Sequence, residues 1–127
     1  MRRVADEYVE YMGRAFEFYE QLSRDTLGYE PPQVLMLTAN GLNCAKAEDL
    51  LAMLGRRGYE FVTLEEAMRD PAYRQPDGYT GPWGISWLQR WAMEKGRDFR
   101  EEPYLSPWMA QFDTYTKKWP PVRNDKK

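Results

Sequence analysis

The sequence contains no histidine and a single cysteine, and both scarcities limit the chemistry that one chain can perform. Without histidine there is no Ser-His-Asp triad, no Cys-His dyad and no His-ligated metal site. Cys44 has no second cysteine to pair with, so a reducing compartment is the simplest interpretation. With no histidine to act as its base, we interpret Cys44 as a bystander thiol rather than a nucleophile. We expect a cytoplasmic protein without a metal or another cofactor.

Long apolar runs and an excess of one charge sign are missing as well. No apolar run is longer than about five residues, whereas a membrane-spanning helix needs roughly 20. The first residues are charged and lack the apolar region of a signal peptide. The 127 residues carry 18 basic and 20 acidic side chains, which argues against a strongly basic nucleic-acid module. We therefore expect one domain that binds neither membranes nor nucleic acid.

The first half of the chain has the apolar patterns of alternating helices and strands. Apolar residues at three- and four-residue steps over residues 4–27 predict one long amphipathic helix. Residues 33–38, which are continuously apolar from Val34 to Leu37, are typical of a strand that is covered on both faces. Three elements follow: a helix over residues 44–57 with Asn43 as its candidate cap, a strand over residues 59–62, and a short helix to about Asp70.

This order predicts an α-β-α-β-α arrangement with two parallel strands joined by right-handed crossovers. Thr63 and Glu66 have the spacing of a capping box and mark the start of the third helix. Two parallel strands are too few for an independent sheet, and their outer edges would leave backbone groups unpaired. Another chain or the C-terminal half must therefore cover them.

The second half, from Tyr73 onward, is rich in turns and aromatic residues. Residues 76–84 are dense in glycine and proline, residues 85–95 predict a helix, and we expect residues 124–127 to be disordered. The aromatic rings of this half either form a platform on which sugar rings or bases stack, or seal the open side of the fold. Those after the helix are Tyr104, Trp108, Phe112, Tyr115 and Trp119.

Four ordered segments carry a family resemblance: residues 28–43, 57–67, 70–73 and 84–92. Together they resemble the C-terminal part of polysaccharide deacetylases of the NodB-homology type, which are carbohydrate esterases with a distorted β/α barrel. The resemblance implies a partial (β/α) barrel over residues 1–96, followed by a C-terminal extension over residues 97–127. Longer family members bind a divalent metal through one Asp and two His of earlier strands, and those motifs are absent here.

The resemblance also locates a candidate site at the end of the first predicted strand. Thr38 occupies the position of the family's general-acid histidine, but threonine does not titrate near neutral pH and cannot shuttle protons. The candidate binding residues are Thr38, Asn40, Asn43, Tyr79 and Trp83. The alternative is that Thr38 and Asn40 only shape a turn.

Two functional hypotheses follow from these observations. The first is a truncated, non-catalytic deacetylase-like domain that acts through self-assembly as a homo-oligomer or through carbohydrate binding. The second is a small repurposed hydrolase of acetyl esters, amides or glycans, with a site near Thr38 and Asn40 in an oligomeric cleft. An Asp or Glu would then be its base, because burial can raise a carboxyl pKa into the useful range.

Overall fold

The computed structural model describes residues 2–110 of the chain. Three of the aromatic residues noted above, Phe112, Tyr115 and Trp119, lie outside the described residues. The same is true of residues 124–127, for which disorder was predicted.

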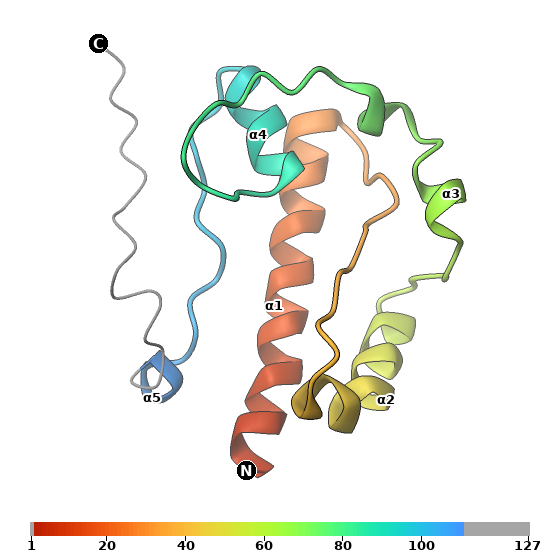
Figure 1. The fold of residues 1–127 in the computed structure, drawn as a ribbon, viewed down its shortest axis with the longest axis vertical. Coiled ribbons are helices and arrows are strands. Elements are labelled where there is room, and N and C mark those ends of the chain that lie inside the picture. The colour runs from red at the N-terminus through yellow and green to blue at the C-terminus, as the bar shows by residue number, and fades with distance from the viewer. Residues whose placement is uncertain (1, 111–127) are drawn as a thin grey trace.

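The longest element is helix α1, Arg2–Leu27, which forms the axis of the molecule (Figure 1). It confirms the long amphipathic helix predicted over residues 4–27. Gly28 ends it with a φ of 82°, a left-handed conformation that glycine adopts without strain, and its amide donates to the Arg24 carbonyl. The Lys95 ammonium donates to the Thr26 carbonyl at 3.0 Å, which satisfies one of the carbonyls left unpaired in the last turn.

The two predicted strands are wrong. Residues 33–38 and 59–62 are extended, but within residues 2–110 there is no strand and no sheet. The predicted α/β partial barrel with two parallel strands in the order α-β-α-β-α is therefore not formed, and the described part of the chain is helical with extended connections. The reason is physical: apolar, β-branched residues favour an extended backbone locally, but a strand needs a hydrogen-bonded neighbour. Here residues 28–40 instead run back beside α1 to reach α2 (Figure 1).

Helix α2, Gly41–Arg56, packs against the N-terminal half of α1. It begins three residues earlier than the predicted 44–57, because Asn40 rather than Asn43 is the cap. The Tyr8 hydroxyl of α1 donates to Asn43 Oδ1 at 2.6 Å, and the Lys46 ammonium donates to Asp6 Oδ1 at 3.1 Å. These contacts tie the start of α2 to the start of α1.

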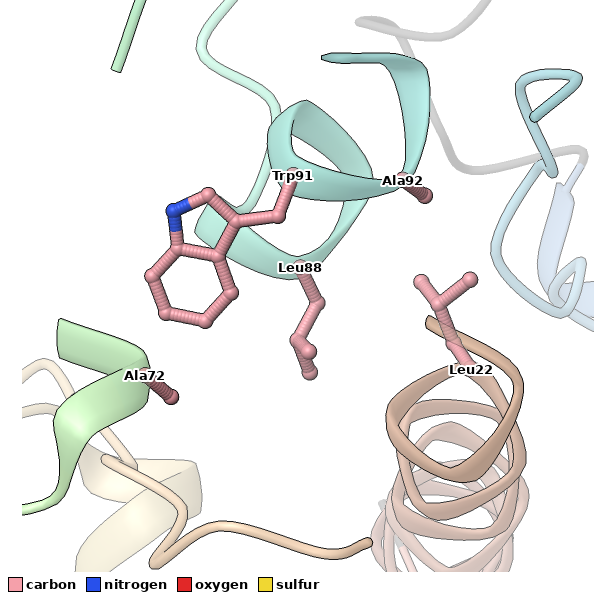
Figure 2. Packing of buried hydrophobic residues seen from close by; sticks show 5 residues of the cluster. All are labelled: Leu22, Ala72, Leu88, Trp91 and Ala92. Atoms are coloured by element: carbon pink, nitrogen blue, oxygen red, sulfur yellow. The ribbon is translucent and has the colours of Figure 1, made fainter. Parts of the chain in front are cut away.

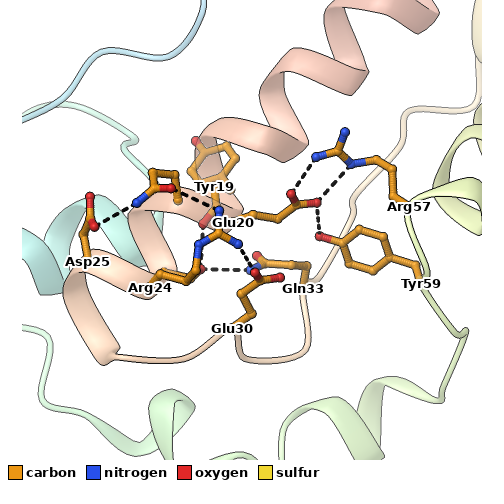
Figure 3. Close-up of polar contacts among 10 residues, drawn as sticks. Tyr19, Glu20, Arg24, Asp25, Glu30, Gln33, Arg57 and Tyr59 are labelled. Carbon is orange, nitrogen blue, oxygen red and sulfur yellow. Dashed lines mark hydrogen bonds and ion pairs between the residues drawn. The ribbon is translucent and has the colours of Figure 1, made fainter.

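A polar cluster holds the residues that follow α2 against the C-terminal half of α1. Arg57 donates to both carboxylate oxygens of Glu20, at 3.0 and 2.5 Å, and the Tyr59 hydroxyl donates to the same carboxylate at 3.0 Å (Figure 3). The Tyr59 ring also packs edge-on against Phe16 of α1, with centroids 5.3 Å apart. Residues 57–59 are thereby fixed on α1, and residues 60–62 extend beyond them.

Two short helical turns follow. Helix α3, Leu64–Ala67, begins with the predicted capping box, in which Thr63 and Glu66 bond each other's backbone amides. It is shorter than predicted, because the chain turns after Ala67 into a 3-10 helix, η1, Pro71–Arg74.

Helix α4, Trp87–Glu94, crosses the C-terminal end of α1 and builds the core there (Figure 2). It matches the helix predicted over residues 85–95 apart from the end residues, and Ser86 and Gln89 form its capping box. The core cluster unites α1, η1 and α4 through Leu22, Ala72, Leu88, Trp91 and Ala92. The last described element is α5, Pro107–Ala110.

Candidate functional site

Three of the five predicted site residues lie together at the start of α2, where they stabilise the helix end. The Asn40 side chain accepts a hydrogen bond from the Asn43 amide at 2.9 Å, which is the N-cap interaction. The Asn43 side chain donates to the Thr38 carbonyl at 2.6 Å and accepts from Tyr8. Thr38 therefore contributes its backbone carbonyl to the cap, and the two asparagine side chains are occupied by these bonds.

The other two predicted residues, Tyr79 and Trp83, lie in the loop before α4. The Tyr79 hydroxyl accepts a hydrogen bond from the Trp83 amide at 3.3 Å, and the Arg90 guanidinium of α4 lies 5.1 Å from the Tyr79 ring centroid. Arg90 also pairs with Asp77 at 2.7 Å. Because α4 crosses the C-terminal end of α1 and Asn43 contacts its N-terminal end, the structure separates Tyr79 and Trp83 from Thr38, Asn40 and Asn43 (Figure 1).

A groove of about 430 Å³ lies between α1, the extended residues 31–36, η1 and α4. Its aromatic and polar lining consists of Tyr19, Gln33, Tyr73, Ser86, Trp87 and Trp91, and the remaining lining residues are apolar. None of the five predicted site residues is among them. The concentration of Trp and Tyr from position 73 onward was the sequence signal for this groove, but Tyr19 and Gln33 come from segments that only the fold brings to it.

Three aromatic rings pack against one another along this groove. The Tyr73 ring lies edge-on to both Trp87 and Trp91, with centroids 5.4 and 5.8 Å away, and the two indoles are 6.2 Å apart and tilted by 31°. Their exposures differ: Trp91 is 4 % exposed and belongs to the core, whereas Trp87 is 45 % exposed. Trp91 therefore seals the fold, whereas the Trp87 ring is accessible from solvent.

The polar atoms of the groove are neutral and mostly held in place. The Tyr73 hydroxyl donates to the Pro32 carbonyl, and the Gln33 amide nitrogen donates to the Ser23 hydroxyl at 3.1 Å. The Tyr19 hydroxyl donates to Glu102. Burial and the hydrogen bond to Glu102 raise the pKa of Tyr19, so this phenol stays protonated at neutral pH.

No Asp, Glu, Lys or Arg is among the residues that line this groove. Such a site does not compensate the charge of an ionised ligand, and its donors and acceptors are hydroxyl and amide groups. With its apolar walls and few polar groups, the groove suits a neutral, partly apolar molecule better than an ionised one.

The described residues do not fit the divalent metal that longer members of the resembled family bind. Within residues 2–110 no three His, Cys, Asp or Glu side chains lie close enough together to hold an ion. Cys44 is exposed on α2.

No protein-family model, no curated protein and no solved structure matches this chain. The resemblance to polysaccharide deacetylases thus rests on the sequence segments alone. No helix within residues 2–110 has the length and apolar character needed to span a membrane.

Proposed function

We propose that the chain is a non-catalytic carbohydrate-binding protein that holds a sugar ring against Trp87. The observation that carries this proposal is the exposed indole of Trp87 in a groove that is lined by aromatic rings and neutral polar groups. A sugar ring presents C–H groups on its faces and hydroxyls around its rim, and it has no charge to compensate. The aromatic face suits the C–H groups, and hydroxyl and amide partners suit the rim.

The polar partners for such a ring come from two sides of the groove. Gln33 bonds Ser23 through its amide nitrogen, and no hydrogen bond to a described residue occupies its carbonyl oxygen. The Ser86 hydroxyl accepts the Gln89 amide at 3.2 Å and lines the same groove as Tyr19. Both side chains are held by the fold before a ligand arrives, which reduces the entropy cost of binding.

Binding without turnover agrees with the chemistry of Thr38. A threonine cannot replace the general-acid histidine of the family that the sequence resembles, and its carbonyl oxygen accepts a bond from Asn43 at the α2 cap. Sugar binding without ester hydrolysis is therefore the expected behaviour, and the two can be measured separately.

The decisive experiment is isothermal titration calorimetry with an N-acetylated chitooligosaccharide. We expect the wild-type chain to bind it and the variant Trp87→Ala to bind about tenfold more weakly, because one stacking surface is lost. Tyr104→Ala is the matched control: Tyr104 is 76 % exposed and does not line the groove, so its removal leaves affinity unchanged. Absence of binding by the wild-type chain, or equal affinity of Trp87→Ala, would overturn the proposal.

A second measurement on the same samples separates binding from hydrolysis. Acetate release from the chitooligosaccharide and from a simple acetyl ester is expected to equal the buffer background. Turnover that disappears in Thr38→Ala would instead support the repurposed hydrolase with its site near Thr38 and Asn40.

A further inference from the structure

The connection between α2 and α3, together with the first residue of α3, presents apolar side chains to solvent. Phe61, Val62 and Leu64 are 66 %, 56 % and 62 % exposed. They border a groove of about 420 Å³ whose other wall includes Val34 and Leu35, which are 49 % and 37 % exposed. Large apolar side chains gathered in one place on a surface are typical of an interface.

The backbone of this connection is equally unpartnered. Tyr59 donates its amide to the Leu54 carbonyl, and Thr63 uses its amide and carbonyl in the α3 cap. Between them, Glu60, Phe61 and Val62 make no backbone hydrogen bond to any other described residue. An extended, apolar segment with free amides and carbonyls is a template for strand addition.

The charged residues on either side of this segment mirror one another in position but differ in sign: basic residues precede Phe61, and acidic residues follow it at the same distances. Arg56 and Arg57 precede Phe61 by five and four residues, and Glu65 and Glu66 follow it by four and five. All four side chains belong to exposed residues. Arg57 already bonds Glu20, whereas Arg56 makes no hydrogen bond or ion pair with a described residue.

We propose that residues 59–63 pair antiparallel with the same residues of a second copy of this chain, about a twofold axis at Phe61. In this register Glu60 faces Val62 of the second copy, and each such pair exchanges both of its backbone hydrogen bonds. Phe61 meets its own counterpart at the position where side chains of an antiparallel pair approach most closely. This inference does not depend on the sugar groove, because Phe61 does not line it.

The same twofold axis brings unlike charges together at both ends. The end of α2, which carries Arg56, lies on the same side as the start of α3 of the second copy, which carries Glu65 and Glu66, and the symmetry repeats this arrangement at the other end. This charge pattern is self-complementary about Phe61, which favours a second copy of the chain as the occupant.

The first test is sedimentation equilibrium of the full chain over a range of concentrations. We expect a reversible dimer for the wild type and a monomer for Phe61→Asp, which places two carboxylates against each other at the axis. Phe61 is largely exposed, so this variant retains its fold, which circular dichroism verifies. Tyr104→Asp is the control and remains dimeric. A monomeric wild type, or a dimeric Phe61→Asp, overturns the proposal.

The second test exchanges the charges at the ends of the segment. Arg56→Glu and Glu65→Lys each place like charges at both ends of their own homodimer, and we expect the dimer Kd of each to rise about tenfold. An equimolar mixture forms a mixed dimer with unlike charges at both ends and regains wild-type affinity. Glu48→Lys, the same charge change elsewhere on the exposed surface of α2, leaves the Kd unchanged. If the mixed dimer has no lower Kd than the homodimers of the two variants, the assigned register is overturned.

Discussion

At the residue scale, Glu20 is the best-connected carboxylate of the described chain. It accepts hydrogen bonds from Arg57 and Tyr59, two residues that come from beyond α2 (Figure 3). Burial acts to raise its pKa, but the hydrogen bonds from Arg57 and Tyr59 outweigh burial and lower the pKa below its ordinary value of 4.5. Burial and the hydrogen bond to Glu20 also raise the pKa of the Tyr59 hydroxyl, which stays protonated and remains a donor.

The lowered pKa of Glu20 predicts a loss of stability in acid. A carboxyl group whose pKa is lower in the folded state stabilises the fold above its unfolded pKa, and this contribution is lost as the pH falls through the folded value. We expect the melting temperature of the wild type to fall as the pH drops below about 4.5. Glu20→Gln should cost about 1–2 kcal/mol at neutral pH and flatten this acid dependence, as measured by thermal unfolding at a series of pH values.

Glu48→Gln is the control for this measurement, because Glu48 belongs to the exposed surface of α2. It should leave both the stability at neutral pH and the acid dependence unchanged. Equal pH profiles for Glu20→Gln and the wild type would contradict the role given to Glu20.

At the element scale, side-chain caps define where the helices begin. Asn40 caps α2, Thr63 caps α3 and Ser86 caps α4. Each satisfies amides that the first helical turn leaves without a partner. The sequence revealed Thr63 through its spacing to Glu66, but at the start of α2 it indicated Asn43, whereas the cap is Asn40. Asn43 lies within the first turn of α2, where its side chain accepts a hydrogen bond from Tyr8 of α1.

The capping role of Asn40 predicts how its variants behave. Asn40→Ala should lower the free energy of unfolding by about 1 kcal/mol, and Asn40→Asp should retain most of it, since aspartate is an equally good cap. Chemical denaturation measures both values. Neither change should affect sugar binding, because Asn40 does not line the Trp87 groove. A loss of sugar affinity without a loss of stability would instead indicate that Asn40 takes part in sugar binding.

At the scale of the whole molecule, the core is concentrated where α1, η1 and α4 meet (Figure 2). Leu22 is 2 % exposed at its centre, while Val34, Met36 and Phe61 remain largely in solvent on the extended connections. The molecule thus combines a small closed core with open apolar segments. Self-association through such a segment removes apolar surface from water that the single chain leaves exposed.

This uneven distribution of burial predicts unequal costs of truncating leucines. Leu22→Ala should lower the free energy of unfolding by about 2–5 kcal/mol, because it leaves a cavity in the core. Leu51→Ala removes the same atoms from a residue that is 49 % exposed on α2 and should cost less than about 1 kcal/mol. Urea denaturation of the two variants checks this difference. Equal losses in the free energy of unfolding would contradict a core centred on Leu22.

The candidate site was predictable only in its composition. The abundance of tryptophan and tyrosine from position 73 onward indicated either a stacking surface or a seal, but not which ring would serve which purpose. Trp87 and Trp91 are one helical turn apart, yet one is exposed and the other buried. The packing of α4 across Leu22 decides this, and no pattern within α4 alone records it. Tyr19 and Gln33 join the groove for the same reason.

What the sequence determined by itself was local: the span of α1 and the capping box of α3. Each depends on side chains within a few residues, through the helical period and the satisfaction of terminal amides. Tertiary structure alone decided that residues 33–38 and 59–62 do not pair. Strand formation needs a hydrogen-bonded neighbour distant in sequence, and an apolar run specifies the need for a partner without specifying its position.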